Sequence, residues 1–109
     1  MEVGKMITST SNQRIKELSQ IQKKSKVRSR EGVFVAEGIR MVRETPYERL
    51  VSLYFSESFE KKYGNEVLDA ISGGDLKIRE QIRRKTEILS DAVFSYVSDT
   101  KTPQGVLAV

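Results

Sequence analysis

The sequence predicts an α/β domain in which helices cover a small, mostly parallel sheet. Short apolar segments rich in β-branched residues alternate along the chain with segments whose apolar residues recur at helical spacing, a pattern typical of parallel strands joined by helices. The 109 residues, 38% of them hydrophobic, amount to one domain with a modest core. The sequence contains neither internal repeats nor low-complexity segments.

The first expected helix precedes a basic loop. Ser9 or Ser11 can cap a helix that ends near Lys23, because a hydroxyl oxygen accepts a hydrogen bond from the free amides of the first turn. Lys16 and Lys23 share an outward face of that helix. Its apolar stripe consists of Ile15, Leu18 and Ile21. Residues 23–32, KKSKVRSREG, are expected to form a loop.

An apolar strand and a short helix come next. Residues 33–37, VFVAE, are short, apolar and β-branched, which predicts a strand in the interior of the sheet. Residues 38–44 fit a helix, and Pro46 ends it because proline has no backbone donor. We expect Ile39 and Val42 to point inward and Arg40 and Arg43 to point outward. A second apolar strand is predicted at 50–56.

The remaining segments continue the alternation. A helix is predicted at 57–74, where Gly64-Asn65 could interrupt it and Gly73-Gly74 stops it. Further elements are a helix at 75–85, a short strand at 86–90, a helix over 90–99 capped by Ser90, a turn at 100–105 and a strand at 106–109. The buried positions expected in the last helix are Val93, Phe94 and Val97.

Positive charge is concentrated in one part of the chain. The net charge is +4, yet residues 14–30 hold seven basic residues and one acidic residue, whereas the remainder holds 12 basic and 14 acidic residues. The seven are Arg14, Lys16, Lys23, Lys24, Lys26, Arg28 and Arg30. Such a cluster is the electrostatic footprint of a polyanionic ligand. A solvated helix face with a basic loop is an equally good explanation at this point.

The Glu37-Gly38 pair lies where the predicted strand meets the next helix. Glycine adopts backbone angles that other residues avoid, and a carboxylate beside the first turn of a helix is stabilised by the helix dipole. Glu37 could also hold a basic group from the neighbouring loop. We interpret the pair as a strand-to-helix turn with an acidic cap. A catalytic carboxylate is the alternative, but the local sequence offers no second carboxylate or base.

Composition excludes several classes of site. The sequence has no Cys, His or Trp, so zinc fingers, thiolate nucleophiles and Ser-His-Asp triads are ruled out. It has neither the glycine spacing of a phosphate-binding loop nor the acidic spacing of a calcium loop. No apolar run approaches the roughly 20 residues of a membrane span, and the first residues have no signal-peptide core. We therefore expect a soluble, cytoplasmic protein.

Short motifs in a fixed order span nearly the whole chain. They are Ile7-Thr8-Ser9, Asn12, Ile15-Lys16, Arg28, Phe34, Glu37-Gly38, Arg40 and Thr102-Pro103-Gln104-Gly105. In this order they resemble the N-terminal half of the SpoU-type, or TrmH-like, RNA 2'-O-ribose methyltransferases. Residues 57–90 match that family weakly.

The resemblance implies a three-layer α/β/α sandwich similar to the ribosomal proteins that bind kink-turn RNA. It implies that residues 1–105 form an RNA substrate-binding domain and that 106–109 begin the strand leading to a methyltransferase domain absent from this chain. In the parent protein that second domain would bind S-adenosylmethionine, transfer the methyl group and form a homodimer. The present chain is then expected to be a monomer without a cofactor, a metal or catalytic residues.

The basic residues are the expected contacts to RNA, with ribosomal RNA as the expected target. They are the seven residues of the cluster and Arg40, which matches the arginine of the family motif. Arg14, Arg28 and Arg30 are the best candidates for specific contacts, because a guanidinium group binds phosphate in two places. A competing interpretation is that Arg28 pairs with Glu37 and serves the fold. A free-standing ribosomal-type RNA-binding protein and a basic protein–protein adaptor remain as alternatives for the whole chain.

Overall fold

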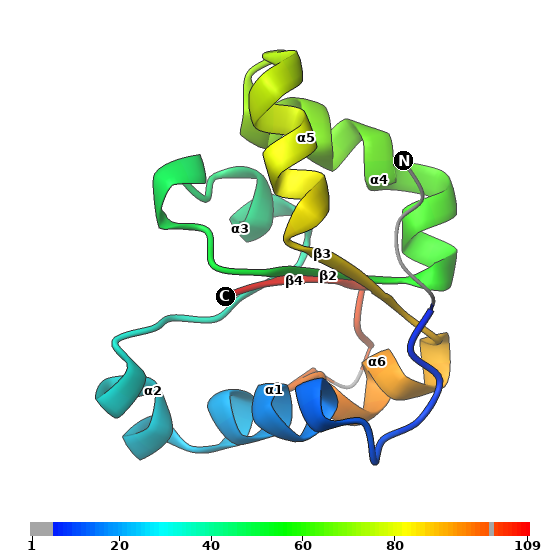
Figure 1. Cartoon of the computed structure of the whole chain (residues 1–109). Helices are drawn as coiled ribbons and strands as arrows, with labels where there is room; N and C mark the ends of the chain where they lie inside the picture. The colour runs from blue at the N-terminus through cyan, green and yellow to red at the C-terminus, as the bar shows by residue number, and fades with distance from the viewer. Residues whose placement is uncertain (1–5, 101) are drawn as a thin grey trace.

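A computed structural model of the chain describes residues 6–100 and 102–109. A four-stranded sheet lies between two layers of helices (Figure 1), which confirms the expected α/β sandwich. Helices α1 and α6, with α2 beside α1, lie on one side of the sheet, and α3, α4 and α5 lie on the other (Figure 1). Residues 1–5 of the expected domain and residue 101 of the expected turn lie outside the described residues.

Apart from helix α2 and a 3-10 turn, which were not predicted, the elements occur in the predicted order. The helices are α1 (Gln13–Lys23), α2 (Ser25–Glu31), α3 (Ile39–Arg43), α4 (Glu57–Ser72), α5 (Leu76–Arg84) and α6 (Asp91–Val97), with a 3-10 turn, η1, at Tyr47–Arg49. The strands are β1 (Ala36–Glu37), β2 (Leu53–Ser56), β3 (Thr86–Leu89) and β4 (Val106–Ala108). Within the described part of the chain, no helix is both long and apolar enough to cross a membrane.

The sheet is mixed, and the prediction of a mostly parallel sheet is wrong in this respect. The strand order is β1-β4-β2-β3; β2 and β3 are parallel, whereas β4 is antiparallel to both β1 and β2. β4 begins beside the end of β1, where Leu107 pairs with Glu37. The Glu37 carboxylate also accepts a hydrogen bond from the Asp99 amide at 3.2 Å, which ties the segment after α6 to the end of β1.

β4 is an integral strand of this domain. Its three residues are buried and lie between β1 and β2, and Val109 continues the pairing by donating its amide to the Ser52 carbonyl at 2.9 Å. The expected boundary at residue 105 therefore does not separate 106–109 from the rest of the fold.

The segment 33–37 differs from its prediction as an interior strand. Only Ala36 and Glu37 pair, and they do so at the edge of the sheet. Ala36 lies opposite Ala108, and Glu37 lies opposite Leu107. Phe34 precedes the ladder and is 85% exposed.

The residues expected to form a basic loop at 23–32 instead contain helix α2. Lys24 adopts an extended conformation and separates α1 from α2. Gly32 ends α2 in the left-handed conformation (φ 68°), and the Val33 amide donates to the Arg28 carbonyl at 3.0 Å, which closes the last turn. α2 buries none of its residues, so its sequence has no apolar stripe that would reveal a helix.

Most helix boundaries agree with the predictions, with two local corrections. The α1 cap is Asn12, whose side chain accepts from the Arg14 amide at 2.8 Å; neither Ser9 nor Ser11 has that role. α4 continues through Gly64, which is buried, and ends at Gly73 as expected. Ser90 caps α6, as predicted, by accepting from the Val93 amide at 3.2 Å.

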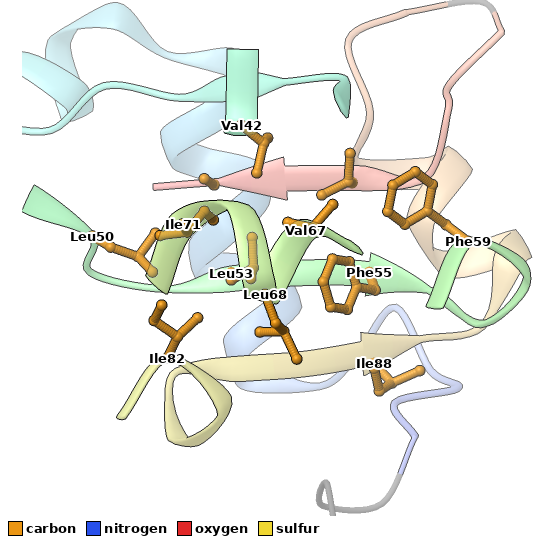
Figure 2. Close-up of a cluster of buried hydrophobic side chains, with 12 residues drawn as sticks. Val42, Leu50, Leu53, Phe55, Phe59, Val67, Leu68, Ile71, Ile82 and Ile88 are labelled. Atoms are coloured by element: carbon orange, nitrogen blue, oxygen red, sulfur yellow. The ribbon is translucent and has the colours of Figure 1, made fainter. Parts of the chain in front are cut away.

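Two apolar clusters fix the layers on the sheet. Alternate residues of β2 point to opposite faces: Leu53 and Phe55 pack against α4, whereas Tyr54 packs with α1 and α6. Figure 2 shows the first cluster, in which Val67 and Leu68 of α4 lie over Leu53 and Phe55. The second cluster joins Ile15 and Leu18 of α1 to Val93, Phe94 and Val97 of α6. The burial of one face of α1 leaves its polar face in solvent.

Candidate nucleic-acid interface

The polar face of α1 and the exposed face of α2 carry most of the predicted contact residues. α1 buries Ile15 and Leu18 against the sheet, so Lys16 and Lys23, seven residues apart, lie on its solvent side. Lys26 and Arg30 are four residues apart on α2 and are also exposed. We define the α1–α2 basic surface as Lys16, Lys23, Lys24, Lys26 and Arg30, all of which are exposed.

An aromatic ring from α6 adjoins this surface. The Lys23 ammonium nitrogen lies 4.7 Å from the ring centroid of Tyr96, a cation–π distance, and Tyr96 is 50% exposed. The contact holds one lysine of the surface against a rigid part of the fold.

Arg30 is free to bind an external anion, whereas Arg14 is partly engaged. The Arg30 side chain is 72% exposed, and its Nε atom lies 3.9 Å from the Glu31 carboxylate, a distance that permits an ion pair but is too long for a hydrogen bond. Arg14 forms an ion pair of 2.8 Å with Glu87 on β3, and its side chain is 65% exposed. Exposed ion pairs contribute little energy, so Arg14 can still contact a phosphate at the N-terminal end of α1.

Arg28 is half-buried and stabilises the fold. One terminal nitrogen donates to the Ile21 carbonyl at 2.8 Å and to the Gln22 carbonyl at 2.9 Å. These carbonyls belong to the last turn of α1, where helical partners are missing and positive charge is favoured by the helix dipole. Arg28 therefore joins α2 to the C-terminal end of α1. The competing interpretation was right that Arg28 serves the fold. It was wrong in naming Glu37 as the partner, because Arg28 contacts the carbonyls of α1 instead.

Arg40 does not belong to the same surface. It is exposed on α3, and α3 lies on the opposite side of the sheet from α1 and α2 (Figure 1). A single ligand would have to reach around the sheet to contact both places. The structure thus groups five of the predicted residues, places Arg14 at the end of the same helix, and separates Arg28 and Arg40 from them.

Glu37 connects three segments of the domain. Its carboxylate accepts hydrogen bonds from the Gln22 side-chain amide at 2.9 Å and the Asp99 backbone amide at 3.2 Å, and from the Ser98 hydroxyl. These donors come from α1 and from the segment that follows α6. The sequence left open a basic partner for Glu37, but the donors found in the structure are all neutral. The contacts support a structural role for Glu37.

The adjacent Gly38 has a separate steric role. Gly38 has φ 92°, and an added Cβ would lie 3.0 Å from the Gln104 side-chain oxygen. That oxygen accepts a hydrogen bond from the Ile39 amide at 2.7 Å. The glycine thus allows the Gln104 side chain to cap the start of α3.

A groove next to β1 contains a residue that sequence reasoning placed in the core. The groove has a volume of about 480 Å³, and Phe34, Pro46, Arg49 and Val51 are among the residues that line it. Phe34 is 85% exposed and Val51 is 61% exposed. No pattern in the sequence could reveal the exposure, because VFVAE has the composition of a buried strand.

Titration and metal binding add no further site to the described residues. Hydrogen bonds from the Ser58 hydroxyl and amide lower the pKa of Asp91 below its ordinary value of 3.8, at the start of α6 and away from the basic surface. Across residues 6–100 and 102–109, the acidic side chains form no group of three that could hold a metal ion.

Comparison with known proteins places this geometry in a family. The family model described as MRM3-like substrate binding domain matches residues 12–108. A solved structure of an rRNA methyltransferase from Sinorhizobium meliloti matches with a TM-score of 0.66 and 18% identity over 95% of this chain. A solved structure of an RNA 2'-O ribose methyltransferase matches with a TM-score of 0.61 and 26% identity, also over 95% of this chain. No curated protein sequence matches the chain significantly.

The chain is similar to only a part of each of those proteins. The chain spans 35% of the first solved structure and 36% of the second, about a third of each. The family model covers nearly the whole chain, from the cap of α1 to the end of β4. The resemblance to a substrate-binding domain of RNA ribose methyltransferases, inferred from the short motifs, is thereby confirmed. The chain belongs to the family of MRM3-like substrate-binding domains.

Proposed function

We propose that this chain is the RNA-binding domain of an RNA 2'-O-ribose methyltransferase and that it positions RNA, with ribosomal RNA as the substrate. The observation that carries the proposal is the family match over residues 12–108, which names a substrate-binding domain. The names of the two similar structures, an rRNA methyltransferase and an RNA 2'-O ribose methyltransferase, support RNA as the substrate. The exposed cations of α1 and α2 supply the charge that RNA requires.

The α1–α2 basic surface would act by positioning. Contacts to phosphate groups fix the register of a nucleic acid without reading its sequence. Methyl transfer to a ribose hydroxyl requires that one nucleotide be held in a fixed place, and correct placement alone contributes much to a rate. Arg30 offers a planar guanidinium for two-point contact with a phosphate, while Lys16, Lys23, Lys24 and Lys26 would provide a broader attractive field.

S-adenosylmethionine would bind elsewhere in a longer protein. The groove beside Phe34 has one charged lining residue, Arg49, and no carboxylate that could receive the ammonium group of the cofactor. These residues do not fit the cofactor. The proposed division leaves RNA binding to this chain and methyl transfer to a separate C-terminal domain. That domain would also form the homodimer, with this chain monomeric alone and the whole protein cytoplasmic.

Charge reversal on the basic surface tests the proposal. Lys23, Lys24 and Lys26 are changed to Glu in one variant, and the matched control carries the same change at Lys61, Lys62 and Lys77, which are exposed on α4 and α5. Binding of ribosomal RNA fragments is measured at several salt concentrations. The first variant should bind weakly and lose roughly 2 units of the log–log salt slope, because each phosphate contact to single-stranded RNA contributes about 0.7. The control should retain the slope.

Two results would contradict the proposal. Equal weakening by both variants would show that net charge alone attracts RNA. A wild-type chain that binds no RNA at low salt would favour the protein–protein adaptor. The free-standing RNA-binding alternative is tested in the encoded full-length protein, which should transfer a labelled methyl group from S-adenosylmethionine to RNA and should lose that activity with the first variant.

A further inference from the structure

Tyr96 brings an aromatic ring to the edge of the α1–α2 basic surface. It lies on the solvent side of α6, whose core-facing residues are Val93, Phe94 and Val97, and it is 50% exposed. α6 packs beside α1 on the same side of the sheet (Figure 1). The Lys23 ammonium nitrogen lies 4.7 Å from the centroid of the Tyr96 ring. The ring is therefore in contact with a cation that the proposed function assigns to RNA.

Lys23 keeps donors available for a phosphate. A lysine ammonium group has three N–H donors, and a cation–π contact supplies no oxygen acceptor for them. Among the residues that the structure describes, no acidic side chain forms an ion pair with Lys23. The Lys23 side chain is also exposed. An anion can therefore bind the ammonium group while the aromatic ring stays beside it.

One carboxylate fixes the two residues relative to each other. The Glu37 carboxylate accepts hydrogen bonds from the Gln22 side chain at 2.9 Å and from the Ser98 hydroxyl. Gln22 immediately precedes Lys23 on α1. Ser98 lies two residues after Tyr96, at the end of α6. The C-terminal ends of both helices are thus tied to a common point, and a pair that is in place before the ligand arrives loses less conformational entropy on binding.

An aromatic ring next to an available cation matches the chemistry of an unpaired nucleotide. A nucleotide offers a flat base to the ring and an anionic phosphate to the ammonium group, and proteins bind single-stranded RNA by stacking bases on aromatic side chains within positively charged surfaces. We propose that Tyr96 stacks on one unpaired base of the bound RNA while Lys23 contacts a phosphate next to that base. The inference rests on the proposed function and adds a base-binding residue to it. The alternative is that Tyr96 only holds Lys23 in place.

Substitutions at Tyr96 separate these two roles through affinity and salt dependence. The probe is a single-stranded oligouridylate of about 12 nucleotides, within the usual site size of such surfaces, titrated into the full chain at several salt concentrations. Tyr96→Leu should weaken binding roughly 5- to 150-fold, the equivalent of about 1–3 kcal/mol for one stacked base. The log–log salt slope should equal that of the wild type, because the substitution removes no charge. Tyr96→Phe should keep most of the affinity, because it retains the ring.

A tryptophan at the same position reports the contact directly. The chain contains no tryptophan, so Tyr96→Trp introduces a single indole, whose emission should fall when a base of the oligouridylate stacks on it. This variant also keeps the inference testable if Tyr96→Leu does not fold. Tyr63 is the matched control, because it is 46% exposed but lies on α4, in the opposite layer of helices. Tyr63→Leu should leave the affinity unchanged, and Tyr63→Trp should leave the emission unchanged.

Four results would overturn the inference while leaving the proposed function intact. The first is wild-type affinity in a folded Tyr96→Leu variant. The second is weaker binding by that variant with a salt slope reduced by about 0.7, the loss expected for Lys23→Ala, since Tyr96 would then only hold the lysine. The third is unchanged emission of Tyr96→Trp at saturation. The fourth is a wild-type chain that binds ribosomal RNA fragments but not the oligouridylate. Absence of binding to the ribosomal RNA fragments as well would overturn the proposed function itself.

Discussion

Replacement of Arg28 by Ala tests whether this basic residue serves the fold or the ligand. The substitution removes two hydrogen bonds from a charged donor to the carbonyls of Ile21 and Gln22, at 2.8 and 2.9 Å. Hydrogen bonds to charged groups contribute about 1.5–3 kcal/mol each. Since Arg28 is only half-buried, solvent screening lowers the value for the pair below the sum of about 3–6 kcal/mol, to about 2–3 kcal/mol together.

The expected loss is large enough to measure directly. For a domain of this size, 1 kcal/mol shifts the melting temperature by roughly 4–8 °C. Arg28→Ala should therefore lower it by roughly 8–24 °C in a melt followed by circular dichroism. At a temperature where both proteins are folded, the affinity for RNA and the salt slope should match those of the wild type.

Arg30→Ala provides the matched control two residues away. Arg30 is exposed, with Glu31 at 3.9 Å as its acidic neighbour, so the free energy of unfolding should change by less than about 0.5 kcal/mol. Its salt slope should fall by about 0.7–0.9. The reverse outcome would refute our assignment: an Arg28→Ala protein with an unchanged melting temperature and weaker, less salt-dependent RNA binding.

Three further substitutions test the contacts that organise the fold. Glu37→Gln should lower the free energy of unfolding in urea by about 1–3 kcal/mol, because its new amide donors would face three existing donors; full stability would contradict the structural role of Glu37. The lowered pKa of Asp91 stabilises the fold above the ordinary value of 3.8 and ceases to do so as pH falls through the lowered value. Asp91→Asn should thus flatten the pH dependence of the melting temperature below about pH 4, and an unchanged pH profile would count against the contact with Ser58. Gly105→Ala should cost at least about 3 kcal/mol, because Gly105 has φ 111° and an added Cβ would lie 2.7 Å from the Phe59 Cβ; a urea midpoint close to the wild-type value would disprove this steric requirement.

The sequence predicts the elements that bury a regular apolar face. Ile15 and Leu18 in α1, and Val93, Phe94 and Val97 in α6, recur at helical spacing and are buried as expected. Apolar spacing does not predict α2, because α2 has no buried residue. The end of α2 depends instead on Gly32 and on the contact of Arg28 with α1. A pattern based on apolar spacing cannot detect a helix that is stabilised by its termini.

The orientation of β4 and the layout of the interface depend on contacts between distant residues. The antiparallel pairing of β4 with β1 joins residues about 70 positions apart, so no local pattern predicts the direction of the last strand. Charge clustering correctly indicated a basic surface on α1. It could not separate the exposed Arg30 from the half-buried Arg28, because both lie in the same basic segment. They differ in their tertiary contacts: Arg28 binds carbonyls of α1, whereas Arg30 faces solvent.

The central place of β4 has a consequence for the order of folding. Among the residues that the structure describes, β1 pairs with β4 alone, and the paired residues Ala36 and Ala108 are about 70 positions apart. Closing so long a loop costs entropy before any contact offsets it. During synthesis, β1 stays unpaired until residues 106–108 are made, and β2, which is made later, lacks its antiparallel neighbour until the same point. The sheet is completed only when residues 106–108 are available, so a nascent chain truncated before β4 would expose two unsatisfied strand edges and be prone to aggregation.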